Sequence, residues 1–143
     1  MAISTAMCTS FKVELLQGVH NFTASTGNSF KMALYTSSAS LDATTTAYSA
    51  TNEITGTGYT AAGNVIDQVT PTASSTTALV DFADESWTTA SFTANGAMIY
   101  NDTVAGDPAV CTLAFGADKV VSSGTFTVQF PTADASNAIL RIA

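Results

Sequence analysis

The side chains that could perform acid–base or nucleophilic chemistry are few in this chain. His20 is the single histidine, and it stands beside Asn21 just after a predicted short helix. Nucleophilic triads and most general-base schemes need a histidine next to a nucleophile. The sequence contains no glycine-flanked serine elbow, no phosphate-cradling glycine loop and no HExxH segment. We therefore expect His20 to be a surface or helix-capping residue and the protein not to be an enzyme.

The densest group of carboxylates is Asp81, Asp84 and Glu85 in the segment DFADESW. Carboxylates together with backbone carbonyls are ligands for hard cations, so a calcium site is one interpretation. A solvated turn is the interpretation that we prefer, because the spacing fits no known calcium loop. Paired-acid glycosidase chemistry needs two acids across a cleft in different environments, and the segment gives no sign of that. We predict no metal and no cofactor.

The aromatic residues raise the possibility of sugar binding, because aromatic faces stack on sugars. Trp87 would be the stacking platform, accompanied by the tyrosines at positions 35, 48, 59 and 100. Packing in the core or in an interface is the commoner fate of such side chains, and we prefer it. Cys8 and Cys111 lie in unlike contexts without zinc spacing, so we expect reduced thiols, with a disulfide as the alternative.

Composition excludes several classes of function. Four basic residues face eleven acidic ones, which gives a net charge of −7 and leaves little to neutralise phosphates. Nucleic-acid binding is therefore not expected. No apolar run approaches the roughly 20 residues that span a membrane, and no signal peptide is evident, so we expect synthesis in a cytoplasm and no membrane contact.

The pattern of apolar residues predicts one short helix and many strands. A helix over about residues 9–17 would begin at Thr9 or Ser10 as the cap and end at Gly18, with Phe11, Leu15 and Leu16 on one side. Strands are expected at 30–35, 64–70 ending at Pro71, 76–82, 92–100 with a bulge at Asn95-Gly96, 109–115, 124–130 and 137–142, with turns at 104–108 and 116–119. This count predicts one all-β domain over 1–143, an antiparallel β-sandwich or jelly roll.

A long connection over about residues 37–63 interrupts this pattern. Its central part, Asp42–Gly63, is rich in Thr, Ser, Gly and Ala and has almost no ordinary core residues. Loops of Thr, Gly and Tyr with few charges are typical of contact surfaces. The candidate interface residues are Tyr48, Asn52, Glu53 and Tyr59. We expect an arm between subunits whose removal over 45–60 leaves the β-domain folded.

Three segments carry a resemblance to a known family. They are LYTSSASLDATTTAYSATNEITGTGYTAAG, VDFADESWTTASFTANGAMIYND and LAFGADKVVSSGTFTVQFP, and the similarity runs from Phe30 to Ala143. The chain resembles small virion structural proteins of tailed bacteriophages, and within such virions it looks most like a capsid cement or decoration protein. The resemblance implies a homo-oligomer, a dimer or trimer, that binds the major capsid protein on the outer capsid surface, and it brings no catalytic residues.

Two alternatives remain open at this point. The first is a virion protein of the tail or of a fibre, although the sequence has neither heptads nor repeated β motifs. The second is a carbohydrate-binding module that helps the particle adhere, with Trp87 as its platform.

Overall fold

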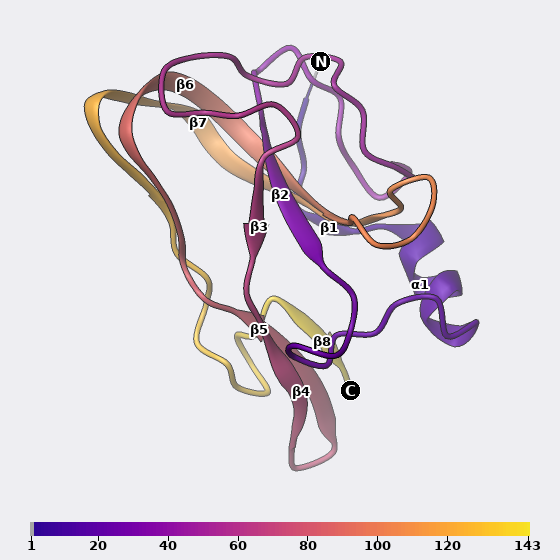
Figure 1. Ribbon diagram of the computed structural model, residues 1–143. Helices are drawn as coiled ribbons and strands as arrows, with labels where there is room; N and C mark the ends of the chain where they lie inside the picture. Colours follow the sequence, from indigo (N-terminus) through magenta and orange to yellow (C-terminus); the bar gives the residue numbers. More distant parts are fainter. Residues whose placement is uncertain (1) are drawn as a thin grey trace.

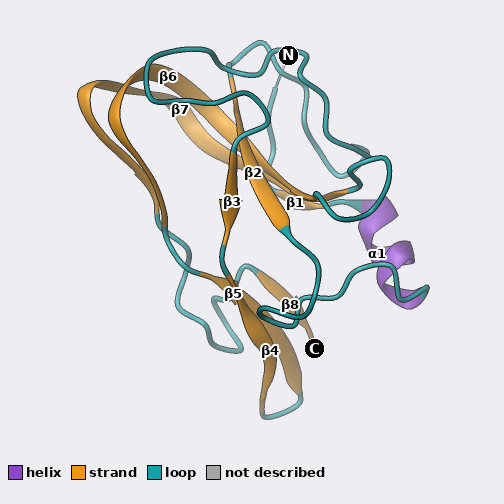
Figure 2. Ribbon diagram, viewed as in Figure 1, coloured by secondary structure: helices purple, strands orange, loops and turns teal. Residues whose placement is uncertain are grey.

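The computed structural model describes residues 2–143 as an all-β protein with one short helix (Figures 1 and 2). The elements are β1 (Ala6–Met7), α1 (Thr9–Leu16), β2 (Phe30–Tyr35), β3 (Asn64–Ile66), β4 (Gln68–Ser74), β5 (Thr77–Phe82), β6 (Glu85–Asn101), β7 (Ala109–Val128) and β8 (Leu140–Ile142). They form two antiparallel sheets, with strand orders β1-β7-β6-β2-β3 and β4-β5-β8. The fold agrees with the predicted β-sandwich, whereas the jelly-roll topology is not confirmed.

The core is continuous between the two sheets. It includes Phe30 and Met32 of β2, and also Phe82 and Leu140, which belong to the small sheet at the lower end of Figure 1. The alternation of apolar and other residues in Phe30–Tyr35 is typical of a half-buried strand, but Met32 through Tyr35 are all fully buried. Strands β3 and β6 pair with its two edges, and the long loop lies over part of the strand, where the Tyr35 hydroxyl donates to the carbonyl of Ser49 at 2.7 Å.

Helix α1 is confirmed over Thr9–Leu16, and Gly18 has the predicted left-handed conformation, with φ 72°. Its capping is different from the prediction. Cys8 is the N-cap residue, with no side-chain cap, and neither Thr9 nor Ser10 takes that role. The N–H of Cys8 donates to the carbonyl of Val110 at 3.0 Å, so the strand before the helix fixes where the helix begins.

The helix also buries a narrower face than expected. Phe11 is buried and Leu15 packs against the core, but Leu16 is 92% exposed. Successive residues of an α-helix are rotated by about 100° about its axis, so Leu16 points to a different side from Leu15. No neighbouring element covers that side. Val13, three residues earlier on the same side of the helix, is also exposed, at 52%.

Pro71 does not end a strand, contrary to the prediction. Strand β4 continues through it to Ser74, and the register with β5 shifts between Val69 and Thr72. Proline has no N–H to donate, so it is tolerated at bulges and on edge strands. Because β4 is an edge strand of the small sheet, Pro71 meets both conditions.

The long hairpin of β6 and β7 dominates the molecule, and it bends sharply at the upper left of Figure 1. The predicted bulge at Asn95-Gly96 is confirmed, since the register shifts between Ala94 and Gly96 while β6 continues. The predicted turn at 116–119 is wrong, because β7 runs without a break from Ala109 to Val128. Ala94 pairs with Lys119 and Gly96 with Ala114, so β7 has the longer path around the bend.

Candidate functional site

The long loop lies against the large sheet and is no free arm; Figure 2 shows it as the teal connection between β2 and β3. Its Ile54 is 2% exposed, and the Ile54 N–H donates to the carbonyl of Leu34 on β2 at 3.0 Å. The N–H of Ser91 on β6 donates to the carbonyl of Thr57 at 2.9 Å. Because the loop buries core surface and pairs with two strands, the expectation that residues 45–60 can be removed without loss of the fold is not supported.

The glycines of the loop allow its backbone to touch the strands. A Cβ on Gly63 would lie 1.8 Å from the carbonyl oxygen of Met32, and one on Gly56 would lie 2.5 Å from that of Ser91. Gly63 also has φ 78°, a left-handed conformation that other residues rarely adopt. The sequence marks these positions as chain breakers, and the structure shows that they are points of close approach.

Glu53 is the centre of a hydrogen-bond network inside the loop. Its Oε2 accepts from the Tyr48 hydroxyl at 2.7 Å, and its Oε1 accepts from the Tyr59 hydroxyl at 2.5 Å. The N–H of Ala62 also donates to Oε1, at 2.7 Å. A carboxylate with three short donors is strongly held, because hydrogen bonds to a charged acceptor are stronger than neutral ones. The network ties three separate parts of the loop together.

The two tyrosines of this network face the inside of the molecule. The Tyr48 ring stacks on that of Tyr100 with centroids 4.7 Å apart, and the Tyr59 hydroxyl also accepts from the N–H of Leu34 at 3.0 Å. Burial and the contact with Glu53 raise the pKa of Tyr48 to about 12 and raise the pKa of Tyr59 further. Both hydroxyls therefore stay protonated at neutral pH and donate to the carboxylate.

The four predicted interface residues thus separate into two groups. Tyr48, Glu53 and Tyr59 come together and hold the loop in shape, whereas Asn52 is exposed, in a left-handed conformation with φ 62°. The side-chain amide of Asn52 donates to the carbonyl of Ser38 at 3.2 Å. Contact of any of these residues with a partner stays a prediction.

The exposed residues of the loop carry hydroxyl, amide and methyl groups and no charge, and the two carboxylates of the loop, Asp42 and Glu53, belong to partly buried residues. Its exposed residues are Thr44, Thr46, Ser49, Ala50, Thr51, Asn52, Thr55, Gly56, Thr57, Gly58, Thr60 and Ala61. We call these residues the neutral loop face. Covering such a surface requires little desolvation of charge, which is the expensive part of burying a polar surface.

His20 is buried, so the prediction of a surface position is wrong. Its Nε2 lies 2.6 Å from Glu14 Oε2, and its Nδ1 lies 3.0 Å from Asn101 Nδ2. The ring packs against Phe11, with centroids 4.8 Å apart. With a carboxylate at one nitrogen and an amide at the other, the imidazole links α1 to β6.

The three candidate carboxylates are used separately. Asp84 Oδ1 accepts from the N–H of Phe130 at 2.8 Å, and Glu85 Oε1 accepts from Asn64 Nδ2 at 2.7 Å. Asp81 Oδ1 is buried and has no hydrogen-bond partner among residues 2–143. Nowhere in that range do three or more His, Cys, Asp or Glu residues gather as ligands for a metal ion.

Trp87 is unsuitable as a stacking platform for sugars. It is 2% exposed, and its ring packs near Tyr59 and Phe126, with centroids 6.4 and 6.0 Å away. Core packing of this residue, the interpretation preferred from the sequence, is confirmed. Cys8 and Cys111 are also buried, as free thiols, and burial raises their pKa values to about 11 and about 12.

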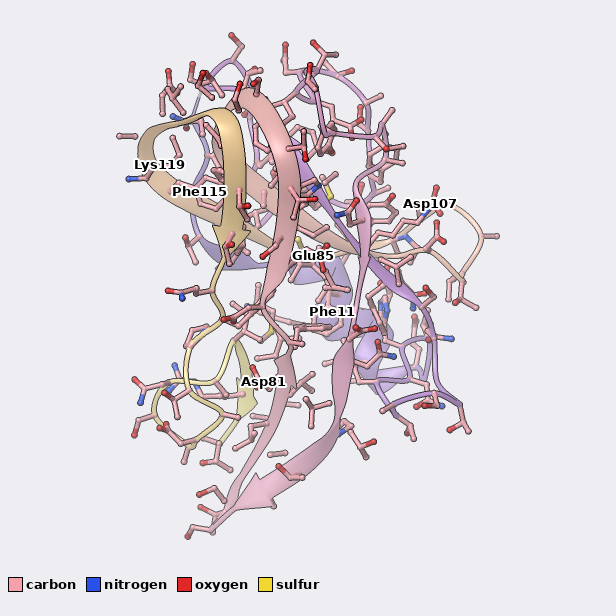
Figure 3. All side chains as sticks on the ribbon, turned by 60° about the vertical axis from the view of Figure 1, so that its left-hand side comes forward. Phe11, Asp81, Glu85, Asp107, Phe115 and Lys119 are labelled. Atoms are coloured by element: carbon pink, nitrogen blue, oxygen red, sulfur yellow. The ribbon has the colours of Figure 1, made fainter. Side chains whose placement is uncertain are left out.

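A concave groove of about 730 Å³ is the feature that sequence reasoning missed. It follows the inside of the bent strand β7, and we call it the β7 groove; Figure 3 labels Phe115 and Lys119 at the bend. Its lining comes from residues 113–115, 118–121 and 125–131, together with Thr5 and Ile139. The sequence showed the alternation of residues 125–130, but it predicted a turn at 116–119 and therefore gave no sign of the bend.

Comparison with known proteins gives no relative: no protein family, no curated protein and no solved structure matches the chain. Within residues 2–143, no helix has the length and apolar character needed to cross a membrane.

Proposed function

We propose that this protein is a non-enzymatic structural protein of a tailed-phage particle that binds the outer surface of the assembled capsid and stabilises it. The neutral loop face is the observation that carries the proposal. A rigid loop, held by Glu53 and by close glycine contacts, presents a surface without exposed charges on a chain of net charge −7. The resemblance of the sequence to small virion proteins supports the same function.

The physical advantage of such a surface is its low desolvation cost. A cement protein needs to bind the assembled shell and not the free subunits, which stabilises the shell by mass action. Modest affinity per copy is sufficient, because many contacts act together across a lattice. The acidic charge also favours the outer wall over the inner one, where the protein would face nucleic-acid phosphates.

The partners in this proposal are the major capsid protein and further copies of the chain, as a dimer or trimer, with no role for nucleic acid or a membrane. Placement on the tail or on a fibre is the competing proposal, and no described contact favours it. Adhesion to sugars loses its candidate stacking platform, because Trp87 is buried.

Addition of the purified protein to expanded shells of the encoding phage, prepared without it, tests the proposal. We expect the protein to bind and to raise the temperature at which the shells break down. A double variant, Thr51→Glu with Thr55→Glu, puts charge on the neutral loop face. Its affinity for the shells should be lower by about tenfold or more, which corresponds to about 1.4 kcal/mol of binding free energy.

The matched control is Thr72→Glu, which adds charge at an exposed position of β4 in the small sheet. It should bind like the unmodified protein. If the folded, unmodified protein neither binds nor protects the shells, the proposal is wrong. If the loop variant binds as well as the control and the unmodified protein, the shell is contacted elsewhere than at the loop.

A further inference from the structure

One edge of β7 has no partner strand over most of its length. On one side β7 pairs with β6 from Ala109 to Val128. On the other side β1 pairs only with Cys111 and Thr112, and beyond Ala114 no strand of residues 2–143 continues the sheet. An unpaired edge presents a row of backbone N–H and C=O groups that another strand can bond.

The β7 groove runs along this free edge. In a strand, successive side chains point to opposite faces. Residues 125–128 at the end of β7 and residues 129–131 beyond it all line the groove, so the groove reaches the free edge of the strand as well as its inner face. The exposed side chains of Thr125 and Gln129 form part of its wall.

Apolar side chains supply the floor of the groove. Phe115, Phe126 and Phe130 are partly exposed, and the rings of Phe115 and Phe126 lie 6.0 Å apart. Val120 is 72% exposed beside them. A free strand edge next to apolar pockets is the arrangement by which proteins bind extended peptides, with the backbone providing affinity and the pockets receiving alternate side chains.

Charge indicates which kind of segment the groove accepts. The chain has eleven acidic and four basic residues, so its field attracts basic segments and opposes a second copy of itself. Lys119 is the one basic side chain among the described groove residues, next to Asp118, whose carboxylate accepts from Asn95 at 2.8 Å. The negative charge of Asp118 offsets the positive charge of Lys119, so the groove itself repels a basic segment little.

We propose that the β7 groove binds an extended segment of another protein, with alternating apolar residues and flanking lysines or arginines, as an added strand along β7. The inference does not rest on shell binding, because the site is defined by the strand edge and the groove, which share no residue with the neutral loop face. The segment pairs with the backbone between Lys119 and Val128.

The probe is the peptide Ac-KTVTVTVK-amide, compared with the same peptide carrying glutamate in place of both lysines. Hydrogen exchange of the backbone amides reports where each one binds. We expect the basic peptide to slow exchange at least tenfold within residues 119–128, less so at high salt, and the acidic peptide to bind at least tenfold more weakly. Absence of protection there, or protection at β3 or β4 instead, overturns the proposal.

The matched variants are Thr125→Lys with Gln129→Lys, both exposed in the wall of the groove, and Thr72→Lys on β4 as the control. The two added lysines should repel the basic peptide and lower its affinity at least tenfold. The exchange of core amides should be unchanged, which shows that the variant is folded. The control should bind normally. Equal peptide binding by both variants contradicts the site. If residues 119–128 are protected from exchange without peptide, and this protection grows with protein concentration, the occupant is a second copy of the chain and the proposal is wrong.

Discussion

At the scale of single residues, Glu53 decides how the long loop is held. Its two carboxylate oxygens accept from two tyrosine hydroxyls and one backbone N–H, and these donors come from both sides of it in the sequence. A carboxylate only accepts, which suits a site where every neighbour donates. Glu53 was singled out from composition as a contact residue, and the structure gives it an internal task.

We predict that Glu53→Gln destabilises the fold. The amide group of glutamine places two donors where one oxygen accepted, so at least one buried donor loses its partner, at a cost of about 1–3 kcal/mol. Urea unfolding measures the change. The control Asp67→Asn removes an exposed carboxylate and should change the free energy of unfolding by less than about 0.5 kcal/mol. Equal effects of the two changes would show that the network contributes little.

Tyr48 predicts a dependence of stability on alkaline pH. Its pKa is raised from 10.0 to about 12, first by burial and then by Glu53, so the folded chain favours the neutral hydroxyl more than the unfolded chain does. The stabilisation is complete below pH 10 and is lost as the pH rises toward 12. Tyr48→Phe keeps the ring stacked on Tyr100 and does not titrate, so its urea midpoint should fall less over this window. Parallel curves for the two proteins would contradict the account.

At the scale of elements, the glycines fix how the loop meets the sheet. Gly63 and Gly106 both have left-handed φ values, 78° and 88°. A Cβ on Gly63 would meet the backbone of Met32, whereas one on Gly106 would meet nothing within 4 Å. Alanine substitutions at these two glycines therefore separate the free-energy cost of the left-handed conformation from the cost of the contact with β2.

Gly106→Ala should lower the free energy of unfolding by about 1–2 kcal/mol, the cost of a left-handed alanine. Gly63→Ala should lower it by about 3 kcal/mol or more, because β2 must also move. Thermal or urea unfolding of both variants measures the difference. A Gly63→Ala protein as stable as Gly106→Ala would show that the close approach is easily relieved.

Local sequence patterns predicted most of the elements. The helix at Thr9–Leu16, strand β2 and the bulge at Asn95-Gly96 follow from periodicity and turn chemistry, whereas the strand predicted over 64–70 is divided between β3 and β4 in different sheets. The errors have a different origin. Gly116 resembles a turn residue and Pro71 resembles a strand end, but the residues on either side of each pair with β6 and β5, so both lie at irregularities inside strands. Such pairing is tertiary and leaves no local signal.

The site was predictable only in its location. The unusual composition of Asp42–Gly63 marked the loop, but not its close packing, because the donors of Glu53 and the neighbours of Gly63 are known only once the chain is folded. His20 shows the same limit. Its sequence neighbours, Val19 and Asn21, do not indicate whether it is buried or exposed, whereas in the fold its contacts with Glu14 and Asn101 bury it.

At the scale of the whole molecule, two surfaces have different characters. The neutral loop face is rigid and uncharged, and it suits a broad contact with an assembled lattice. The β7 groove is a strand edge with apolar pockets, and it suits one extended segment. A protein with both could lie on a shell and hold a peptide arm of a neighbouring subunit, and each contact can be removed without the other.

The most direct test of the proposed function is a particle reconstruction of the encoding phage at a resolution that distinguishes strands. The account predicts density for this fold on the outer surface of the capsid, with residues 42–63 facing the shell. Density for the fold in the tail, in a fibre or inside the shell, or an intact particle without it, would contradict the proposal.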